Sequence, residues 1–305
     1  MQTDETRVLY YHVIADHLPD IYPQGISVRS FFRQFSLLKG LGWRPVKLSD
    51  ALDGQENGKN LCITLDDGLA CNFPALLQMM KSYKLKPTLF LIGKCLDNHD
   101  LAWNHKLLLL RRYVPSARLD AQIDGIMKNA DQTTLFTQLE MAQKDEVLDW
   151  LWDRLLPWTR QEYLTRNHPF FSSEQLKILV SLGAELALHS HSHPDFSRLD
   201  KIAVSAEIND NLNALEGLKL PYQRFLALPY GLPPKPEIEP ILKAELKLKA
   251  LLGTRYSKGD NQKSPFRWQR QNLERSAPLN LVEFFLKPQL RNWKDVHGKH
   301  KPETV

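Results

Sequence analysis

The sequence predicts an α/β fold on three observations: a length that suits one large domain, short apolar runs, and amphipathic stretches between them. The chain has 305 residues, of which 43% are hydrophobic, enough for a substantial single core, although two small domains would also fit. Because strand and helix patterns alternate along the chain, we expect either a β/α barrel or a layered sheet.

Six apolar runs have the length and composition of buried parallel strands. They span residues 8–14, 61–65, 88–92, 185–188, 225–228 and 249–252. Helical periodicity covers residues 30–41, 73–83 and 174–182, and the last of these follows a capping box formed by Ser172 and Gln175. These segments together predict the alternating framework.

One connection is far longer than the others. Roughly ninety residues separate the third predicted strand from the fourth, where a crossover needs about a dozen. The extra segment, at about 97–171, has helix-like, aromatic-rich stretches, so we expect an ordered helical insertion that forms a lid or a groove wall. Filling of a local core explains Trp150 and Trp152 equally well. We expect one domain over residues 1–290 and a polar, flexible tail over 291–305.

Charge and cysteine content limit the partners and the compartment. The net charge of +5 and pI near 8.9 are mild, and the basic residues are scattered, so nucleic acid is not the expected partner. An anionic glycan and a phospholipid surface both stay open. The three cysteines show no metal-type spacing, and neither a signal peptide nor a transmembrane run is visible. We therefore expect a soluble, cytoplasmic protein, with peripheral membrane contact left open.

Two adjacent carboxylates follow the second predicted strand, where α/β domains place reactive groups. Asp66 and Asp67 precede Gly68, and successive side chains point in different directions. One carboxylate could therefore bind a metal while its neighbour acts as a base. An ordinary Asp-Asp-Gly turn is the better explanation of the segment when it is taken alone.

Three histidines follow the fourth predicted strand within five residues. His189 and His193 face the same side if the chain makes a helical turn, and neutral imidazoles suit Zn, Fe or Co. His191 is out of phase, so we expect it to lie beside the metal ligands or at the surface. A solvated polar loop is the alternative. Further along, the turn Pro229-Tyr230-Gly231 could expose backbone N–H groups to an oxyanion.

These motifs resemble those of the polysaccharide deacetylase family, which shares the NodB homology domain and is otherwise called carbohydrate esterase family 4. LCITLDDGLACN resembles the T-F-D-D-G motif with its downstream Asn, and KPTLFLIG resembles A-T-F-F-L-x-G. GAELALHSHSHPDF is similar to G-x-E-I-G-x-H-T-x-x-H-P, and FLALPYG to a variant third motif. The opening YYHVIAD is similar to a bacterial subgroup that acts on exopolysaccharide or peptidoglycan-type amino sugars.

The resemblance implies a distorted (β/α) barrel of about seven parallel strands, with the helical insertion between the third and fourth. It implies Asp66 as general base and a divalent metal, zinc or else iron or cobalt, on Asp67, His189 and His193. Three protein ligands leave positions open for water and substrate, as catalysis requires. Tyr230 would contribute its backbone N–H to the oxyanion.

The match departs from the family at the proton donor and at an arginine. No histidine lies between His193 and His297 to supply the family's late acid, so His12, near the end of the first predicted strand, is our candidate for the acid or for a substrate contact. A histidine bonded to backbone fits equally well. Ala227 replaces the third-motif arginine, and Arg270 resembles a late strand residue that could hold the base instead, unless it is a surface arginine.

Three smaller departures are Leu65 for Phe, Ala187 for Gly and Ser190 for Thr. Together with the missing late histidine, they favour altered specificity or weaker activity over a change of fold. The sequence predicts metal-dependent hydrolysis of an N-acetyl amide on an amino sugar of a polysaccharide or lipid-linked glycan precursor. The alternatives are a deformylase or other C–N amide hydrolase on this fold, and a weakened carbohydrate-binding protein. Trp103, Tyr230 and Trp268 could line a sugar groove or belong to the core.

Overall fold

A closed barrel of parallel strands forms the centre of the molecule. The computed structural model describes residues 5–55, 57–126, 139–254 and 266–274. The barrel strands are β1 (Glu5–Tyr11), β3 (Lys59–Leu65), β4 (Thr88–Leu91), β5 (Glu185–Leu188), β6 (Phe225–Ala227), β7 (Ala250–Gly253) and β8 (Arg267–Asn272). The order β1-β8-β7-β6-β5-β4-β3 closes through a β1–β3 pair, which runs in register from Glu5 opposite Lys59 to Tyr11 opposite Leu65. The short strand β2 (Arg44–Pro45) extends the sheet outside β3.

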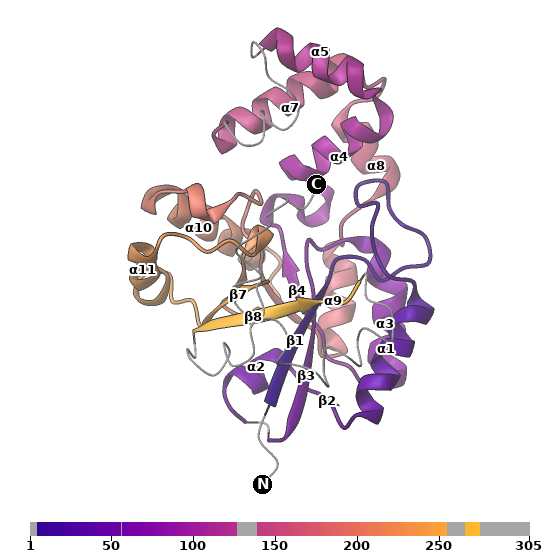
Figure 1. Ribbon diagram of the computed structural model, residues 1–305, viewed down its shortest axis with the longest axis vertical. Coiled ribbons are helices and arrows are strands. Elements are labelled where there is room, and N and C mark those ends of the chain that lie inside the picture. The colour runs from indigo at the N-terminus through magenta and orange to yellow at the C-terminus, as the bar shows by residue number, and fades with distance from the viewer. Residues whose placement is uncertain (1–4, 56, 127–138, 255–265, 275–305) are drawn as a thin grey trace, which may run out of the picture.

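Helices cover the outside of the barrel (Figure 1). They are α1 (Val28–Gly40), α2 (Leu48–Leu52), α3 (Phe73–Tyr83), α9 (Ser173–Ser181), α10 (Lys201–Gly217) and α11 (Glu239–Ala244). Buried Phe31, Phe35 and Leu38 form the inner face of α1, at the i, i+4, i+7 spacing of an amphipathic helix. The predicted capping box of Ser172 and Gln175 opens α9. Short 3₁₀ turns span Ala70–Asn72, Gly93–Asn98, Phe196–Arg198, Pro229–Gly231 and Pro236–Ile238.

The insertion between β4 and β5 is helical, as predicted. Its helices are α4 (Trp103–Tyr113), α5 (Ser116–Ile126), α7 (Met141–Leu155) and α8 (Arg160–Asn167). They pack in a second hydrophobic cluster, which includes the fully buried Trp152 and also Val13 and Ile92 from the segments after β1 and β4. Trp150, in contrast, is 45% exposed, so the core explanation holds only for Trp152.

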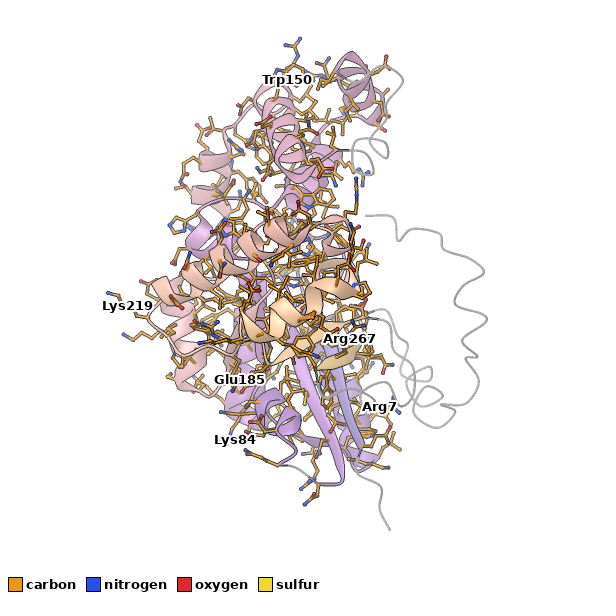
Figure 2. All side chains as sticks on the ribbon, turned by 90° about the vertical axis from the view of Figure 1, so that its left-hand side faces the viewer. Arg7, Lys84, Trp150, Glu185, Lys219 and Arg267 are labelled. Carbon is orange, nitrogen blue, oxygen red and sulfur yellow. The ribbon has the colours of Figure 1, made fainter. Side chains whose placement is uncertain are left out.

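The insertion stands over one end of the barrel. Figure 2 places Trp150 at one end of the molecule and Arg7 and Glu185, early residues of their strands, towards the other. The carboxyl ends of the strands therefore face the insertion. In a parallel barrel this is the end where reactive groups gather.

All six predicted strands and the three predicted helices are present, with ends shifted by a few residues. The first strand ends at Tyr11, earlier than predicted, and leaves His12 on the rim. The sequence prediction missed β8 as an apolar strand because its residues, RWQRQN, are mostly polar. The tail over 291–305 lies outside the described residues, and the single domain stays a prediction. Among the described helices, none combines the length and hydropathy of a membrane span.

Candidate metal centre

Asp66 and Asp67 diverge from a sharp turn at the carboxyl end of β3. The Asp66 N–H donates to the Tyr11 carbonyl at 2.9 Å, so the sheet pairing continues one residue past the strand. Asp67 and Gly68 then both have positive φ, 65° and 75°. Aspartate tolerates this left-handed conformation better than most residues, and a Cβ at Gly68 would lie 2.9 Å from the Leu91 side chain. The turn separates the two carboxylates, as their predicted division of roles requires.

The histidine loop brings His189 and His193 together without a helix. A helical turn would place both histidines on one side, but the segment is irregular, with positive φ at Ser190 (65°) and His193 (63°). The Ser190 hydroxyl accepts the His193 N–H at 3.1 Å and stabilises this path. The two imidazoles nevertheless lie with ring centroids 4.9 Å apart.

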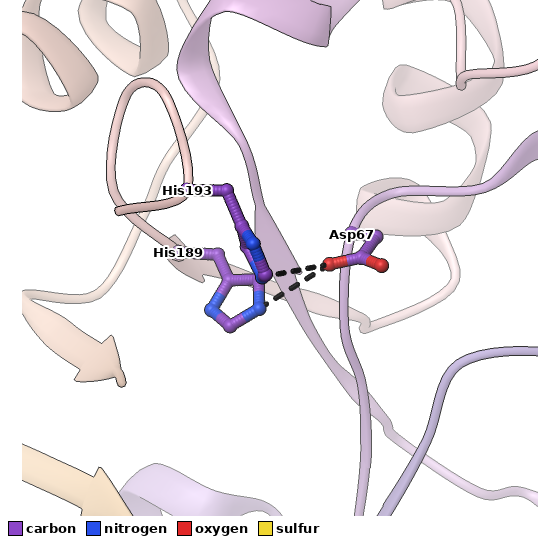
Figure 3. Close-up of side chains that lie close together, drawn as sticks. All are labelled: Asp67, His189 and His193. Atoms are coloured by element: carbon purple, nitrogen blue, oxygen red, sulfur yellow. Dashed lines mark ion pairs between the residues drawn. The ribbon is translucent and has the colours of Figure 1, made fainter. Parts of the chain in front are cut away.

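Asp67, His189 and His193 converge on one point (Figure 3). Asp67 Oδ1 lies 3.3 Å from His189 Nε2 and 3.6 Å from His193 Nε2, and one ligand atom from each residue falls within 4.8 Å of the others. The opposite ring nitrogens have other partners: His189 Nδ1 lies 2.8 Å from the Ala227 carbonyl, and His193 Nδ1 lies 3.0 Å from the Tyr230 hydroxyl. An Nδ1–H donated to the Ala227 carbonyl leaves the His189 Nε2 lone pair for a metal.

These residues fit a divalent cation. Asp67 Oδ1 is buried and, within the described part of the chain, has no hydrogen-bond partner, although a buried carboxylate oxygen normally has one. Burial alone would raise the pKa of Asp67, but His105, His189 and His193 reverse this and hold the pKa well below its ordinary value. Asp67 is therefore ionised and can serve as an anionic ligand. Two imidazoles and one carboxylate suit zinc and also iron or cobalt.

Arg270 holds Asp66 from inside the barrel. Its Nη1 and Nη2 donate to Asp66 Oδ1 and Oδ2 at 2.6 and 2.8 Å, and its side chain is fully buried. The Tyr10 and Phe90 rings lie 4.9 and 5.1 Å from the guanidinium. Burial tends to raise the pKa of Asp66, but Arg270, His189 and His12 outweigh it and lower the pKa. Arg270 is thus not a surface arginine, and it lies where the resemblance placed it.

We expect Arg270→Met to lower the free energy of unfolding by about 3–5 kcal/mol, because it leaves the Asp66 charge buried and unpaired. The loss should shrink as pH falls, since a carboxylate with a lowered folded-state pKa contributes stability above its unfolded pKa and loses it on protonation. Denaturant unfolding at several pH values measures both effects. The control is Arg267→Met on the same strand, where a half-exposed ion pair with Glu239 is worth about 0–1 kcal/mol. Equal losses in the two variants would contradict the prediction.

His12 lies on the rim beside a carboxylate that the sequence prediction missed. Its Nδ1 is 3.3 Å from Glu274 Oε2, and Glu274 Oε1 accepts the backbone N–H groups of His12 and, at 2.8 Å, of Val13. The Tyr22 ring stacks on the imidazole at 4.8 Å. Burial lowers the pKa of His12, but Glu274, Asp67 and Asp66 outweigh burial and raise it to about 9. His12 therefore holds a proton near neutral pH and is more than a histidine bonded to backbone.

The aromatic residues predicted for a sugar groove divide into two groups. Trp103 and Trp268 are only 5% and 8% exposed, and both lie in hydrophobic clusters, so they are core residues. Tyr230 is 38% exposed, and its ring centroid lies 4.9 Å from that of His193. A positive φ of 57° turns Tyr230 towards the histidine. Gly231 follows because a Cβ there would lie 2.0 Å from the Thr254 hydroxyl oxygen.

Four further residues come from the segments around the site. The sequence analysis missed Glu274 because it follows the polar residues of β8, which have no apolar pattern. Asn72, noted only as the family's downstream Asn, donates to the His12 carbonyl and accepts the Ile14 N–H, both at 2.7 Å. His105 lies 3.5 Å from Asp67 Oδ2, although it belongs to the insertion, where the sequence predicted only a helix-like, aromatic-rich stretch. His191 is partly buried, and its backbone N–H donates to Glu207 at 2.9 Å.

Comparison with known families decides the assignment. A family model described as polysaccharide deacetylase matches residues 53–248, well over half of the chain. The chain belongs to the polysaccharide deacetylase family. It is therefore a hydrolase of carbon–nitrogen bonds other than peptide bonds, on a NodB-like barrel, as the motifs predicted. The matched residues include both carboxylates and the histidine loop, while His12 and Arg270 lie outside them.

Solved deacetylase structures share the fold. The Streptococcus pyogenes deacetylase PplD is 16% identical, with a TM-score of 0.58 over 92% of this chain and 98% of that one. IcaB from Ammonifex degensii is 18% identical, with a TM-score of 0.56 over 94% and 98%. A de-N-acetylase from Aggregatibacter actinomycetemcomitans is 14% identical, with a TM-score of 0.57 over 92% and 99%. No curated protein sequence matches the chain. At these identities the likeness supports the fold, which spans nearly the whole chain.

Proposed function

We propose that this protein removes N-acetyl groups from an amino sugar of a polysaccharide or lipid-linked glycan precursor, with a divalent metal that is zinc by preference. One observation carries the proposal. Asp67 Oδ1, which has no hydrogen-bond partner among the described residues, lies opposite the Nε2 atoms of two histidines, beside a second carboxylate held ionised by Arg270. A ligand set and a separate base are the two parts that metal-assisted hydrolysis needs.

In this mechanism, Asp67, His189 and His193 would hold the cation, and Asp66 takes a proton from the attacking water. A cation bound here would polarise the acyl carbonyl and lower the pKa of water. Asp66 is suited to the base role because its lowered pKa keeps it ionised and Arg270 fixes both of its oxygens. Arg270 thus holds the Asp66 carboxylate from the barrel interior. Asp66 takes the proton of the water on the side that faces the barrel rim.

His12 is proposed as the acid that protonates the departing amine. Glu274 occupies its Nδ1, so Nε2 is the nitrogen left to face a substrate. The raised pKa keeps that nitrogen protonated when Asp66 is already ionised, which separates the acid from the base. The backbone N–H of Tyr230 remains our predicted donor to the oxyanion, and its exposed ring offers a face on which a sugar could stack.

Acetate release tests the proposal. We expect the protein to release acetate from chito-oligosaccharides. A chelator should reduce the rate at least about 100-fold, because losing the cation should cost more activity than losing a residue that hydrogen-bonds to a metal ligand, which typically costs about 10–100-fold. Re-addition of Zn²⁺, Co²⁺ or Fe²⁺ should restore the rate and rank the metals. The readout is acetate release together with metal content before and after chelation.

Parallel substrates separate the alternatives. Release of formate from N-formyl sugars, without acetate from N-acetyl ones, would favour a deformylase. Tight metal binding without release from any glycan or lipid-linked sugar would favour a binding protein.

A further inference from the structure

His105 is a buried histidine that the proposed chemistry does not use. It lies on α4 of the insertion, with no exposed surface, and neither ring nitrogen has a hydrogen-bond partner within the described ranges. Its Nε2 lies 3.5 Å from Asp67 Oδ2, the oxygen that faces away from His189 and His193. The Phe170 ring lies on another side of the imidazole, with centroids 5.3 Å apart.

A polar ring buried without a partner carries an energetic cost. Desolvating such a group without a compensating hydrogen bond costs about 1–3 kcal/mol, so an apolar residue would fill this position more favourably if packing were its only purpose. The nearest opposite charge is Asp67, and a small shift of either side chain converts the 3.5 Å separation into a normal hydrogen bond. A hydrogen bond to the Asp67 carboxylate therefore explains why a histidine occupies this buried position.

The first turn of α4 contacts both ligand segments. Trp103 donates its Nε1–H to the His193 carbonyl at 2.8 Å, and the Lys144 ammonium from α7 lies 4.8 Å from the Trp103 ring centroid. One residue after His105, the buried Lys106 binds Asp145 at 2.9 Å and Asp149 at 2.7 Å, and so fixes α4 to α7. This turn is consequently held in place from both sides, as a positioning element requires.

We propose that His105 is a positioning residue that donates its Nε2–H to Asp67 Oδ2 and so leaves Oδ1 as the oxygen that would bind a cation. The insertion then forms part of the metal centre and is not merely a cover. This inference rests on the proposed metal-dependent function. Metal-ligating carboxylates are commonly fixed by such outer hydrogen bonds, and their loss typically weakens metal binding about 10–100-fold.

The test compares variants of His105 with a packing control on the same helix. We expect His105→Ala to lower Zn²⁺ affinity about 10–100-fold and to change the visible absorption spectrum of the Co²⁺-loaded protein. His105→Gln, whose amide can donate to Oδ2, should recover part of the affinity and the spectrum. Leu109→Ala, at an equally buried site one turn along α4, should destabilise the protein without either effect.

The outcomes separate this proposal from the function on which it rests. Unchanged Zn²⁺ affinity and Co²⁺ spectrum in His105→Ala would overturn the positioning role alone, as would equal losses in Leu109→Ala. X-ray absorption that shows three imidazoles on Zn²⁺ in the wild type, and two in His105→Ala, would make His105 a ligand and also overturn it. A wild-type protein that binds no Zn²⁺, Co²⁺ or Fe²⁺ would overturn the proposed function and the role of His105 together.

Discussion

Replacing Asp66 by asparagine is expected to lower kcat for deacetylation about 10²–10⁴-fold, the range that a positioned general base contributes. The amide keeps the shape of the carboxylate and can still accept from Arg270, but it cannot take a proton from water. Metal content should stay at the wild-type level because Asp66 is not among the converging ligand atoms. Steady-state acetate release and metal analysis of the purified variant measure the two quantities.

Two controls keep this result interpretable. Asp66→Asn leaves the buried Arg270 charge with a neutral partner, so the variant's unfolding curve must show that it is folded at the assay temperature. Asp67→Asn provides the contrast, because it should lose metal affinity as well as rate. Full activity in Asp66→Asn would eliminate the base assignment, and loss of metal in that variant would place Asp66 among the ligands.

The barrel could be predicted largely because its strands are short and apolar. Buried on both faces, β3 to β7 read as continuous apolar runs, which periodicity analysis detects. The residues of β8 are polar because Arg270 binds the buried Asp66 and Arg267 is half exposed at the surface. Periodicity analysis does not detect such a polar strand, and only the family resemblance indicated β8.

The sequence predicted those residues of the site that lie in short contiguous motifs. Asp66, Asp67, His189 and His193 each follow a strand, so their meeting at the carboxyl end of the barrel follows from topology. Glu274 and His105 could not be found in this way. Each reaches the site from a segment with no motif, at a separation of 262 residues from His12 in the case of Glu274. Tertiary contacts of this kind are fixed by the fold and leave no local pattern.

His12→Gln is expected to lower kcat for an N-acetyl sugar about 10²–10⁴-fold if His12 protonates the departing amine. The same variant should hydrolyse an activated aryl acetate at nearly the wild-type rate, because a phenolate leaves without needing a proton. The ratio of the two rates therefore measures acid catalysis apart from metal binding and folding. An equal loss of rate on both substrates would show that His12 only binds substrate or stabilises the structure.

The Glu274→Gln variant tests the same acid through pH. Burial lowers the pKa of His12, and Glu274 contributes most to raising it to about 9, so removing that carboxylate charge should lower the His12 pKa. The alkaline limb of kcat/KM should then move to lower pH, while the acid limb set by Asp66 stays in place. A bound cation would lower the His12 pKa in both proteins, so the shift between them is the measurement. An alkaline limb that is identical in Glu274→Gln and the wild type would show that another group supplies the proton.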